Sequence, residues 1–249
     1  MSGGLKEDWN EVVQNALDRL IPVYDKMNSV MSFGQDIEWR KWGLSLVLKP
    51  NSRILDAGCG PGVMSQTLLE LDSEARPVLY DALASMLSEA RNRLGKMQRG
   101  LVRGIFEKMP FSDNSFDVVT MGFSFRDSQD MSQALSELSR VIAPNGSLLI
   151  VDISKPDSAL PRLAIGFYWR ILVPFIAMLA VRSYWRYYSV LHTTYRRLPR
   201  NSQLQALVSK YFEEVHAQTK MSGGMMILTA FRPRKSRPPL QETAEVHPR

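Results

Sequence analysis

The chain has 249 residues, of which 45% are apolar and 22% charged, which excludes a disordered or collagen-like protein. Its one cysteine excludes both an intramolecular disulfide framework and a zinc site built from cysteines, and favours a reducing, intracellular compartment. The formal net charge of +6 leaves nucleic acid, an anionic membrane surface or no particular partner open.

Residues 1–48 predict a helical cap. The N-terminus is acidic and amphipathic, without the basic flank and apolar core of a secretory signal. Apolar side chains recur at helical spacing over residues 5–20, and residues 35–48 predict a second helix. We therefore expect no secretory signal here and a folded helical segment instead.

Residues 49–156 alternate between short apolar runs and helical patterns. Strands are expected at 53–57, 77–81, 101–103, 116–121 and 147–153, and helices at 63–71, 84–94 and 131–142. The turn sequence Pro144-Asn145-Gly146 is expected to end the last of these helices. This alternation predicts an α/β fold with parallel strands and right-handed crossovers. Further strands are expected at 214–218 and 225–231, within a C-terminal segment 201–232.

Residues 157–200 form a helical insert that is both aromatic and basic. Leu163–Val181 is its most apolar stretch, interrupted by Arg170 and kinked by Pro174. Its longest uncharged run, from Ile171, has eleven residues, whereas a membrane span needs about 20. The stretch therefore predicts a buried or capping helix, or an interfacial helix or substrate lid, with a true span as the third alternative.

The insert also carries the chain's positive charge. Between positions 162 and 200 it has seven arginines and no aspartate, glutamate or lysine: Arg162, Arg170, Arg182, Arg186, Arg196, Arg197 and Arg200. Aromatic rings among arginines are typical of a membrane interface and of single-stranded RNA binding, and they also suit a solvent-facing cover. We expect a membrane surface or a prenyl tail there rather than nucleic acid. Residues 233–249 are Arg/Lys/Pro-rich and then polar, and predict a disordered tail.

A glycine loop follows the first predicted strand of the core. Asp56 precedes Gly58, Cys59, Gly60 and Gly62, and Asp81 ends the next strand, where it can hydrogen-bond a ribose. The dinucleotide fingerprint would need glycine at position 63, where the chain has valine. A carboxylate at position 56 would repel a pyrophosphate but suits a sulfonium with an amino-acid tail, so the pattern favours S-adenosylmethionine over NAD. Cys59 is interpreted as a small residue that fits the loop.

Taken together, these motifs resemble class I S-adenosylmethionine-dependent methyltransferases. More narrowly, the chain resembles the C-methyltransferases of ubiquinone and menaquinone biosynthesis, through segments at 24–34, 123–127, 152–156 and 223–226. The resemblance covers residues 20–232. It implies a Rossmann-like α/β fold with a mostly parallel seven-stranded sheet, helices on both faces and a helical insert before the last strands.

The same resemblance implies the site. Ala82, Ile105, Phe106 and Gly122 join the loop residues around the cofactor, although Ile105-Phe106 replaces the family's usual Asp or Asn followed by Ala. Arg126 is the expected oxyanion stabiliser, with an ion pair on the surface as its alternative role. Asp127 would accept a proton or orient Arg126, and Tyr24, with Asn28, would close the site. His192 is expected to pack or be solvated rather than act as a base, and no metal is expected.

What the resemblance implies is an enzyme that C-methylates a prenylated quinol ring, demethylmenaquinol to menaquinol. Methylation of another apolar molecule such as a sterol or lipid is the first alternative. A binding module for membranes or nucleic acid on the same fold is the second. A cytoplasmic protein, peripheral on the inner face of the membrane, is expected, and a homodimer stays open.

Overall fold

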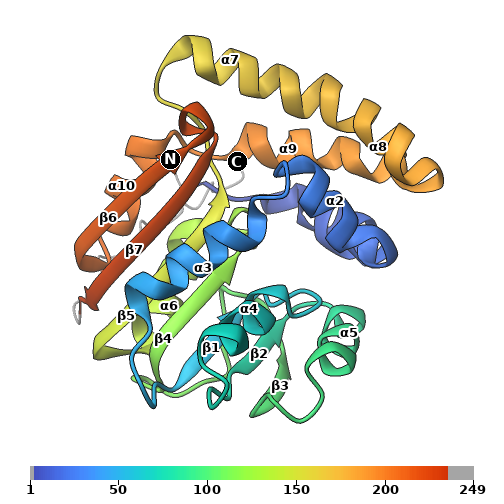
Figure 1. The fold of residues 1–249 in the computed structure, drawn as a ribbon. Coiled ribbons are helices and arrows are strands. Elements are labelled where there is room, and N and C mark those ends of the chain that lie inside the picture. The colour runs from blue at the N-terminus through green and yellow to red at the C-terminus, as the bar shows by residue number, and fades with distance from the viewer. Residues whose placement is uncertain (1–2, 235–249) are drawn as a thin grey trace, which may run out of the picture.

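A seven-stranded sheet forms the centre of the molecule in the computed structural model, which describes residues 3–234 (Figure 1). Its strand order is β3-β2-β1-β4-β5-β7-β6, and every strand is parallel to its neighbours except β7, which runs antiparallel to β5 and β6. The strands are β1 (Ile54–Ala57), β2 (Val78–Asp81), β3 (Gly100–Arg103), β4 (Phe116–Gly122), β5 (Ile142–Ile153), β6 (Phe212–Lys220) and β7 (Met225–Pro233). The expected mostly parallel seven-stranded α/β sheet is confirmed.

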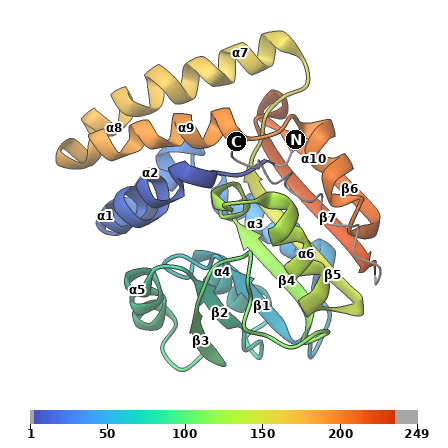
Figure 2. The same ribbon diagram turned by 180° about the vertical axis from the view of Figure 1, so that it is seen from behind.

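Helices cover both faces of this sheet. On the face seen in Figure 1 lie α3 (Asp36–Val47) and α4 (Val63–Leu71), with α5 (Ala84–Leu94) beside α4. The view from behind shows α6 (Met131–Val141) and α10 (Asn201–Val208) on the opposite face (Figure 2). The strand order reverses between β1 and β4, and in open α/β sheets the crevice at such a point is where ligands bind.

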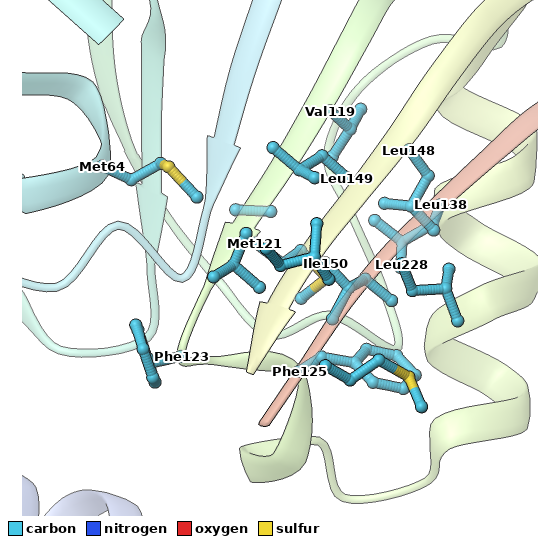
Figure 3. Close-up of a cluster of buried hydrophobic side chains, with 14 of the residues drawn as sticks. Met64, Val119, Met121, Phe123, Phe125, Leu138, Leu148, Leu149, Ile150 and Leu228 are labelled. Carbon is cyan, nitrogen blue, oxygen red and sulfur yellow. The ribbon is translucent and has the colours of Figure 1, made fainter. Parts of the chain in front are cut away.

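The hydrophobic core lies between the central strands and these helices. Val119, Leu149 and Ile150, from β4 and β5, are almost fully buried because parallel strands with helices on both faces have no solvent face. Figure 3 shows the two phenylalanines after β4 lying apart from each other, and both are buried members of the core, Phe125 at 1% and Phe123 at 9% exposed. The core therefore anchors the segment after β4.

The N-terminal cap packs on the end of the sheet where the loops after the strands lie, in several pieces. The single helix expected over residues 5–20 is divided into a 3-10 turn (η1, Lys6–Asp8), a π-helix (η2, Asn10–Leu17) and a short α1 (Asp18–Leu20). A further 3-10 turn (η3, Ile21–Val23) leads into α2 (Tyr24–Met31). The apolar face predicted there is buried, with Leu5, Val12 and Leu20 at most 2% exposed.

The insert forms a long helical rod that doubles back. Its first arm joins α7 (Ala159–Phe167), the π-helical η5 (Tyr168–Leu172) and α8 (Val173–Val181), and its second joins the 3-10 η6 (Arg182–Ser189) and α9 (Val190–Arg197). Pro174 lies at the start of α8, directly after the π-helical η5, and proline cannot donate the usual backbone hydrogen bond.

Two expectations about boundaries are wrong. Helix α6 ends at Val141, and Pro144-Asn145-Gly146 does not end a helix but interrupts β5, between the pairs Phe116–Ile142 and Val118–Ser147. Extra residues on one strand of a pair bulge out without ending the strand. Strand β7 runs to Pro233, one residue into the expected tail, and residues 235–249 lie outside the described residues.

Candidate functional site

The glycine loop after β1 is shaped by backbone contacts with β2. The amides of Gly58 and Cys59 donate hydrogen bonds to the carbonyl oxygen of Tyr80, at 2.7 and 3.0 Å. The φ angles of Gly58, Gly60 and Gly62 are all between 53° and 88°, a region that favours glycine. A methyl group on the Gly58 α-carbon would come within 2.4 Å of Ser124, so the loop also requires glycine for space.

Asp81 is held at the end of β2 by the same loop. The Gly60 amide donates to one of its carboxylate oxygens and the Leu83 amide to the other, both at 2.9 Å. Burial raises the pKa of Asp81, and these two hydrogen bonds oppose the rise. The carboxylate therefore stands fixed beside the loop, as a ribose-binding acid would have to be.

Asp56, within β1, is almost fully buried. The backbone amide and hydroxyl of Ser65 both donate to its Oδ2, at 3.1 and 2.6 Å. Its Oδ1 has no hydrogen-bond partner among the described residues, and burial raises the pKa of this carboxyl to about 6. A buried acceptor without a partner is costly, so Asp56 lacks one favourable hydrogen bond at this position.

A first cavity opens over the loop and brings together eight of the predicted site residues. They are Tyr24, Gly58, Gly60, Asp81, Ala82, Ile105, Phe106 and Asp127. The N-terminal cap closes it with Trp9, Val13 and Leu17, which the sequence analysis did not assign to the site. Their helical spacing was visible in the sequence, but an apolar helix face signals burial without saying what it covers.

Four predicted residues lie behind this cavity. Cys59 packs against α5, and burial raises the pKa of its thiol well above the ordinary value, which agrees with a packing role. Gly62 faces Ala90 and Leu94 of α5, and Gly122 faces Met64 and Arg40. Asp56, the fourth, lies behind the wall as well, so these residues shape the site rather than line it.

Arg126 is buried and paired. Its Nη1 lies 2.6 Å from Asp152 Oδ1, its backbone amide donates to Asp152 Oδ2 at 3.0 Å, and its Nε lies 3.7 Å from Asp127. The alternative role, a surface ion pair with Asp127 or Asp130, is met only in part. The ion pair with Asp127 is present, but it is buried, since Arg126 is 7% exposed, and Asp130 instead caps α6. The sequence analysis assigned Asp152 to a motif but gave it no role, because β5 and Arg126 come together only in the folded chain.

The charges of this cluster depend on one another. Burial alone would lower the pKa of Arg126, but Asp152 and Asp127 outweigh it and the pKa is raised above its ordinary value. Burial raises the pKa of Asp127 to about 7, although Arg126 opposes the rise. The guanidinium is therefore permanently charged, and Asp127 can exchange a proton near neutral pH.

A second, apolar cavity of about 240 Å³ lies on the other side of Phe123. Its walls are mostly apolar. They come from α2, η5 and the last hairpin, with Arg126 and Asn28 among the few polar groups: Asn28, Met31, Phe33, Phe123, Arg126, Ile153, Ile165, Trp169 and Met225. Exposed Phe33 and Met221 stand at its rim.

Phe123 is the wall that the two cavities share, and it adopts a left-handed φ of 62°. For a bulky residue this conformation is strained, and such strain concentrates at functional sites. Tyr24 stands on the loop side, where a Cβ on Gly60 would lie 3.7 Å from its hydroxyl oxygen. A donor held over the loop would thus face an acceptor in the apolar cavity across Phe123.

His192 lies on α9 and lines neither cavity. Burial lowers its pKa, with Arg170 and Arg196 adding to the effect. Within residues 3–234 no three histidine, cysteine or acidic side chains are grouped so that they could hold a metal ion.

Fold and site together define a class I methyltransferase. A solved SAM-dependent methyltransferase of Thermotoga maritima superposes with a TM-score of 0.59 at 18% identity, covering 87% of this chain and 98% of its own. Another, from Aquifex aeolicus, gives 0.55 at 16% identity, covering 84% and 97%. At these identities the likeness concerns the fold alone.

The family follows from the sequence of nearly the whole chain. Residues 5–231 match the model of the ubiE/COQ5 methyltransferase family, and the chain belongs to that family. The demethylmenaquinone methyltransferase of Lactiplantibacillus plantarum is 34% identical over 83% of this chain and 90% of its own. That of Oceanobacillus iheyensis is 30% identical over 86% and 92%. The chain is thus a methyltransferase, as expected.

The family and fold imply S-adenosylmethionine as the cofactor, and the residues present fit it. Glycines at 58 and 60 leave the loop backbone bare toward the first cavity, Asp81 is fixed for a ribose, and the apolar Ile105 and Phe106 face the same space. The Ile105 carbonyl accepts a hydrogen bond from the Tyr80 hydroxyl at 2.6 Å. An adenine would therefore rely on apolar packing there, as the Ile105-Phe106 replacement predicts.

Proposed function

We propose that this enzyme uses S-adenosylmethionine to C-methylate a prenylated quinol, converting demethylmenaquinol to menaquinol. The names of its relatives support the substrate class. The observation that carries the proposal is the position of Arg126: a buried, permanently charged group in a mostly apolar cavity, one side chain away from the glycine loop. The other polar residues of this lining are Asn28, Ser32 and Asp36. Mostly apolar walls with a fixed cation among them suit a ring whose oxygen becomes negative during the reaction.

The cofactor, when bound, supplies an electrophilic methyl group on a sulfonium. We assign Gly58, Gly60, Asp81, Ala82, Ile105 and Phe106 to the walls that hold it, with Asp56, Cys59, Gly62 and Gly122 shaping the loop from behind. The cap residues Trp9, Val13 and Leu17 exclude water from above. Alignment and exclusion of water are the main tasks of the protein in a direct displacement.

A quinol ring carbon becomes nucleophilic when a neighbouring hydroxyl loses its proton. In our proposal Arg126 stabilises the resulting oxyanion, and Asp127 accepts the proton directly or through a water. Asp152 positions Arg126 through both its side chain and its backbone amide. Tyr24 closes the site between Gly60 and Arg126, and the positive charges of Arg126 and Arg40 oppose the rise in its pKa that burial causes.

The experiment is methylation of reduced demethylmenaquinone with radiolabelled S-adenosylmethionine. We expect label in the ring, measured after extraction of the quinones. Cofactor binding without ring methylation would overturn the substrate assignment, and a screen of lipid extracts, sterols included, would then test the first alternative.

We also propose that the insert brings the enzyme to the inner surface of the membrane, where such substrates reside. The helical rod Ala159–Val181 has the length and apolar composition of a span, but its buried side, with Trp169, Val173 and Ala177, packs on the protein. Its other side exposes one apolar stripe: Leu160, Leu163, Phe167, Ile171, Phe175, Met178 and Leu179. A patch of this extent marks an interaction surface, and Arg170 within it suits anionic headgroups.

The positive charge of the insert is less free than the sequence suggested. Arg197 pairs with Glu7 and Asp8 of the cap, at 3.0 and 2.7 Å, and Arg162 donates to the backbone carbonyls of Pro156 and Asp157. The membrane contact proposed here therefore depends mainly on the apolar stripe and less on charge.

Flotation with liposomes, with and without anionic lipid, tests this contact. We expect the variant with Leu163→Gln and Phe167→Gln to bind at least tenfold more weakly than the parent. Leu71→Gln, at an exposed apolar position on α4, should bind as the parent does. Equal flotation of all three would contradict the assignment.

A further inference from the structure

The second, apolar cavity beside Arg126 is too small for a whole prenylated quinol. Its volume is about 240 Å³, whereas sites that enclose a drug-sized ligand have roughly 300–1,000 Å³. The space suits a ring, and a tail of several prenyl units has to leave it. The favourable exit is a part of the rim that is apolar and continues into another apolar surface.

One part of the rim, between α2 and η5, is held together by a hydrogen bond. The Tyr168 hydroxyl donates to the Met31 carbonyl oxygen at 2.9 Å, and the centres of the Phe33 and Tyr168 rings lie 6.3 Å apart. A chain that passed here would have to break this hydrogen bond and separate the two rings. This part of the rim is therefore the less favourable exit.

Another part of the rim lies between α7 and η7 (Met221–Gly223), the turn that joins β6 to β7. Both views of the fold show this turn next to α7 (Figure 1, Figure 2). Ile165 packs here on Gly224, so closely that a methyl group on Gly224 would come within 2.5 Å of the Ile165 Cδ1. The Gly224 φ of −87° is open to any residue, so glycine serves there to leave space.

Beyond this contact lies an outer hollow, which shares Ala164, Ile165 and Met221 with the cavity. The rest of its lining is Leu160, Pro161 and Ser222, and none of the six residues is charged. Leu160, which is 80% exposed, also belongs to the apolar stripe of the insert. The cavity, the outer hollow and the stripe therefore follow one another as a mostly apolar path from Arg126 to the surface.

We propose that the prenyl tail of the substrate leaves the cavity between α7 and η7, passes Ile165 at Gly224 and lies in the outer hollow. This path rests on the proposed function. An uncharged hydrocarbon chain fits a lining without charges, because its apolar surface is buried and no charged group has to be matched. A turn of the half-buried Ile165 side chain opens the passage. Since the hollow ends at Leu160, the far part of a long tail stays in the membrane while the ring reaches Arg126.

The kinetic test compares reduced demethylmenaquinone with the bare naphthoquinol ring, in the parent and in Ala164→Trp. Burial of only two methylene groups changes an affinity by about tenfold, so the parent should have a KM at least tenfold lower for the prenylated quinol. Ala164 is exposed and lines both the cavity and the outer hollow, so tryptophan fills the passage there without replacing a buried residue. We expect Ala164→Trp to lose this preference in KM.

Ala159→Trp is the matched control. It makes the same substitution at an exposed position of the same helix, and Ala159 lines neither the cavity nor the outer hollow. This variant should keep the preference of the parent.

Photo-cross-linking locates the tail in the parent protein and does not depend on the folding of a variant. The probe is a demethylmenaquinone whose second prenyl unit carries a diazirine, and the labelled peptides are identified by mass spectrometry. We expect label within residues 160–165 or 221–222.

Three results would overturn the path: equal KM of the parent for the two quinols, a folded Ala164→Trp that keeps the full preference, or label confined to residues 31–33. A parent protein that binds S-adenosylmethionine and methylates neither quinol would instead overturn the proposed function, so the two failures are distinguishable.

Discussion

Arg126 combines a fixed position with a permanent charge. Its backbone amide and its guanidinium both contact Asp152, so the side chain cannot turn away without losing a buried ion pair. A preorganised cation stabilises developing negative charge at no cost of rearrangement during the reaction. The burial of the Arg126–Asp152 ion pair at the end of β5 therefore supports a role of Arg126 in the reaction as well as a rigid position.

We expect Arg126→Met to lower the rate of ring methylation by about 10²–10³, as loss of one oxyanion-stabilising group does. Cofactor affinity should stay within a fewfold of the parent, because Arg126 lines the apolar cavity and not the loop cavity. Single-turnover kinetics and calorimetry measure the two quantities. A folded, cofactor-binding Arg126→Met that methylates at the parent rate would refute the catalytic role.

Asp127 makes stability depend on pH. Its pKa is about 7 in the folded protein and about 3.9 in an unfolded chain, so between these values the folded state binds more protons. The free energy of unfolding should therefore fall as pH rises from about 4 to 7, by at most about 1.4 kcal/mol per pH unit from this group. Asp56, raised to about 6, should act in the same direction.

Urea unfolding across this pH range checks the expectation. Asp127→Asn should flatten the dependence, whereas Asp72→Asn, at a half-buried position after α4, should leave it as in the parent. An Asp127→Asn variant with the full parent slope would show that Asp127 is not the group responsible.

At the scale of elements, the N-terminal cap is the cover of the cofactor cavity. Its apolar face forms a small cluster of its own with Leu83 and Met86, separate from the main core. An element held by a satellite cluster can open while the sheet stays folded. We therefore expect the cofactor to enter by opening of this cover while the strands stay folded.

Trp9→Ala should loosen this cover. Removing a large buried side chain lowers the free energy of unfolding by about 3–5 kcal/mol. Because Trp9 packs in the separate cluster of the cap, we expect most of this loss to affect the cap. We expect faster hydrogen exchange over residues 5–20 and roughly tenfold weaker cofactor binding, with exchange in β4 and β5 unchanged. Trp185→Ala, a partly exposed aromatic of the insert, is the control and should leave both readouts unaltered.

At the scale of the whole molecule, a ligand in the first cavity joins the cap, the loop and the segment after β4. The cavity takes residues from positions 9 to 127, so its ligand binds only the folded chain. A ligand at 100 times its dissociation constant then adds about 2.7 kcal/mol to the free energy of unfolding. S-adenosylhomocysteine should accordingly raise the melting temperature by roughly 5–10 °C. Thermal unfolding that is insensitive to this ligand would contradict a cofactor site that includes the cap.

Much of the fold and of the cofactor loop could be predicted from the sequence. Helices α4 and α5 begin and end where expected, because their apolar periodicity is bounded by glycines and polar turns. Gly58, Gly60 and Asp81 were predictable since a strand, a glycine loop and an acid after the next strand occur in fixed order. The prediction that Pro144-Asn145-Gly146 ends a helix was wrong. A local turn signal carries no information about β4, with which the chain pairs both before and after this turn.

The sequence by itself determined the class of fold, the family and the glycine loop, since all three depend on short-range patterns. Only the tertiary structure decided that Arg126 is buried with Asp152, that Trp9 covers the loop cavity, and that Arg40 lies against Gly122 and the Phe123 ring. It also decided that the apolar insert leaves one stripe in solvent. These facts depend on contacts between segments distant in the chain, and neither periodicity nor composition records which side chain meets which.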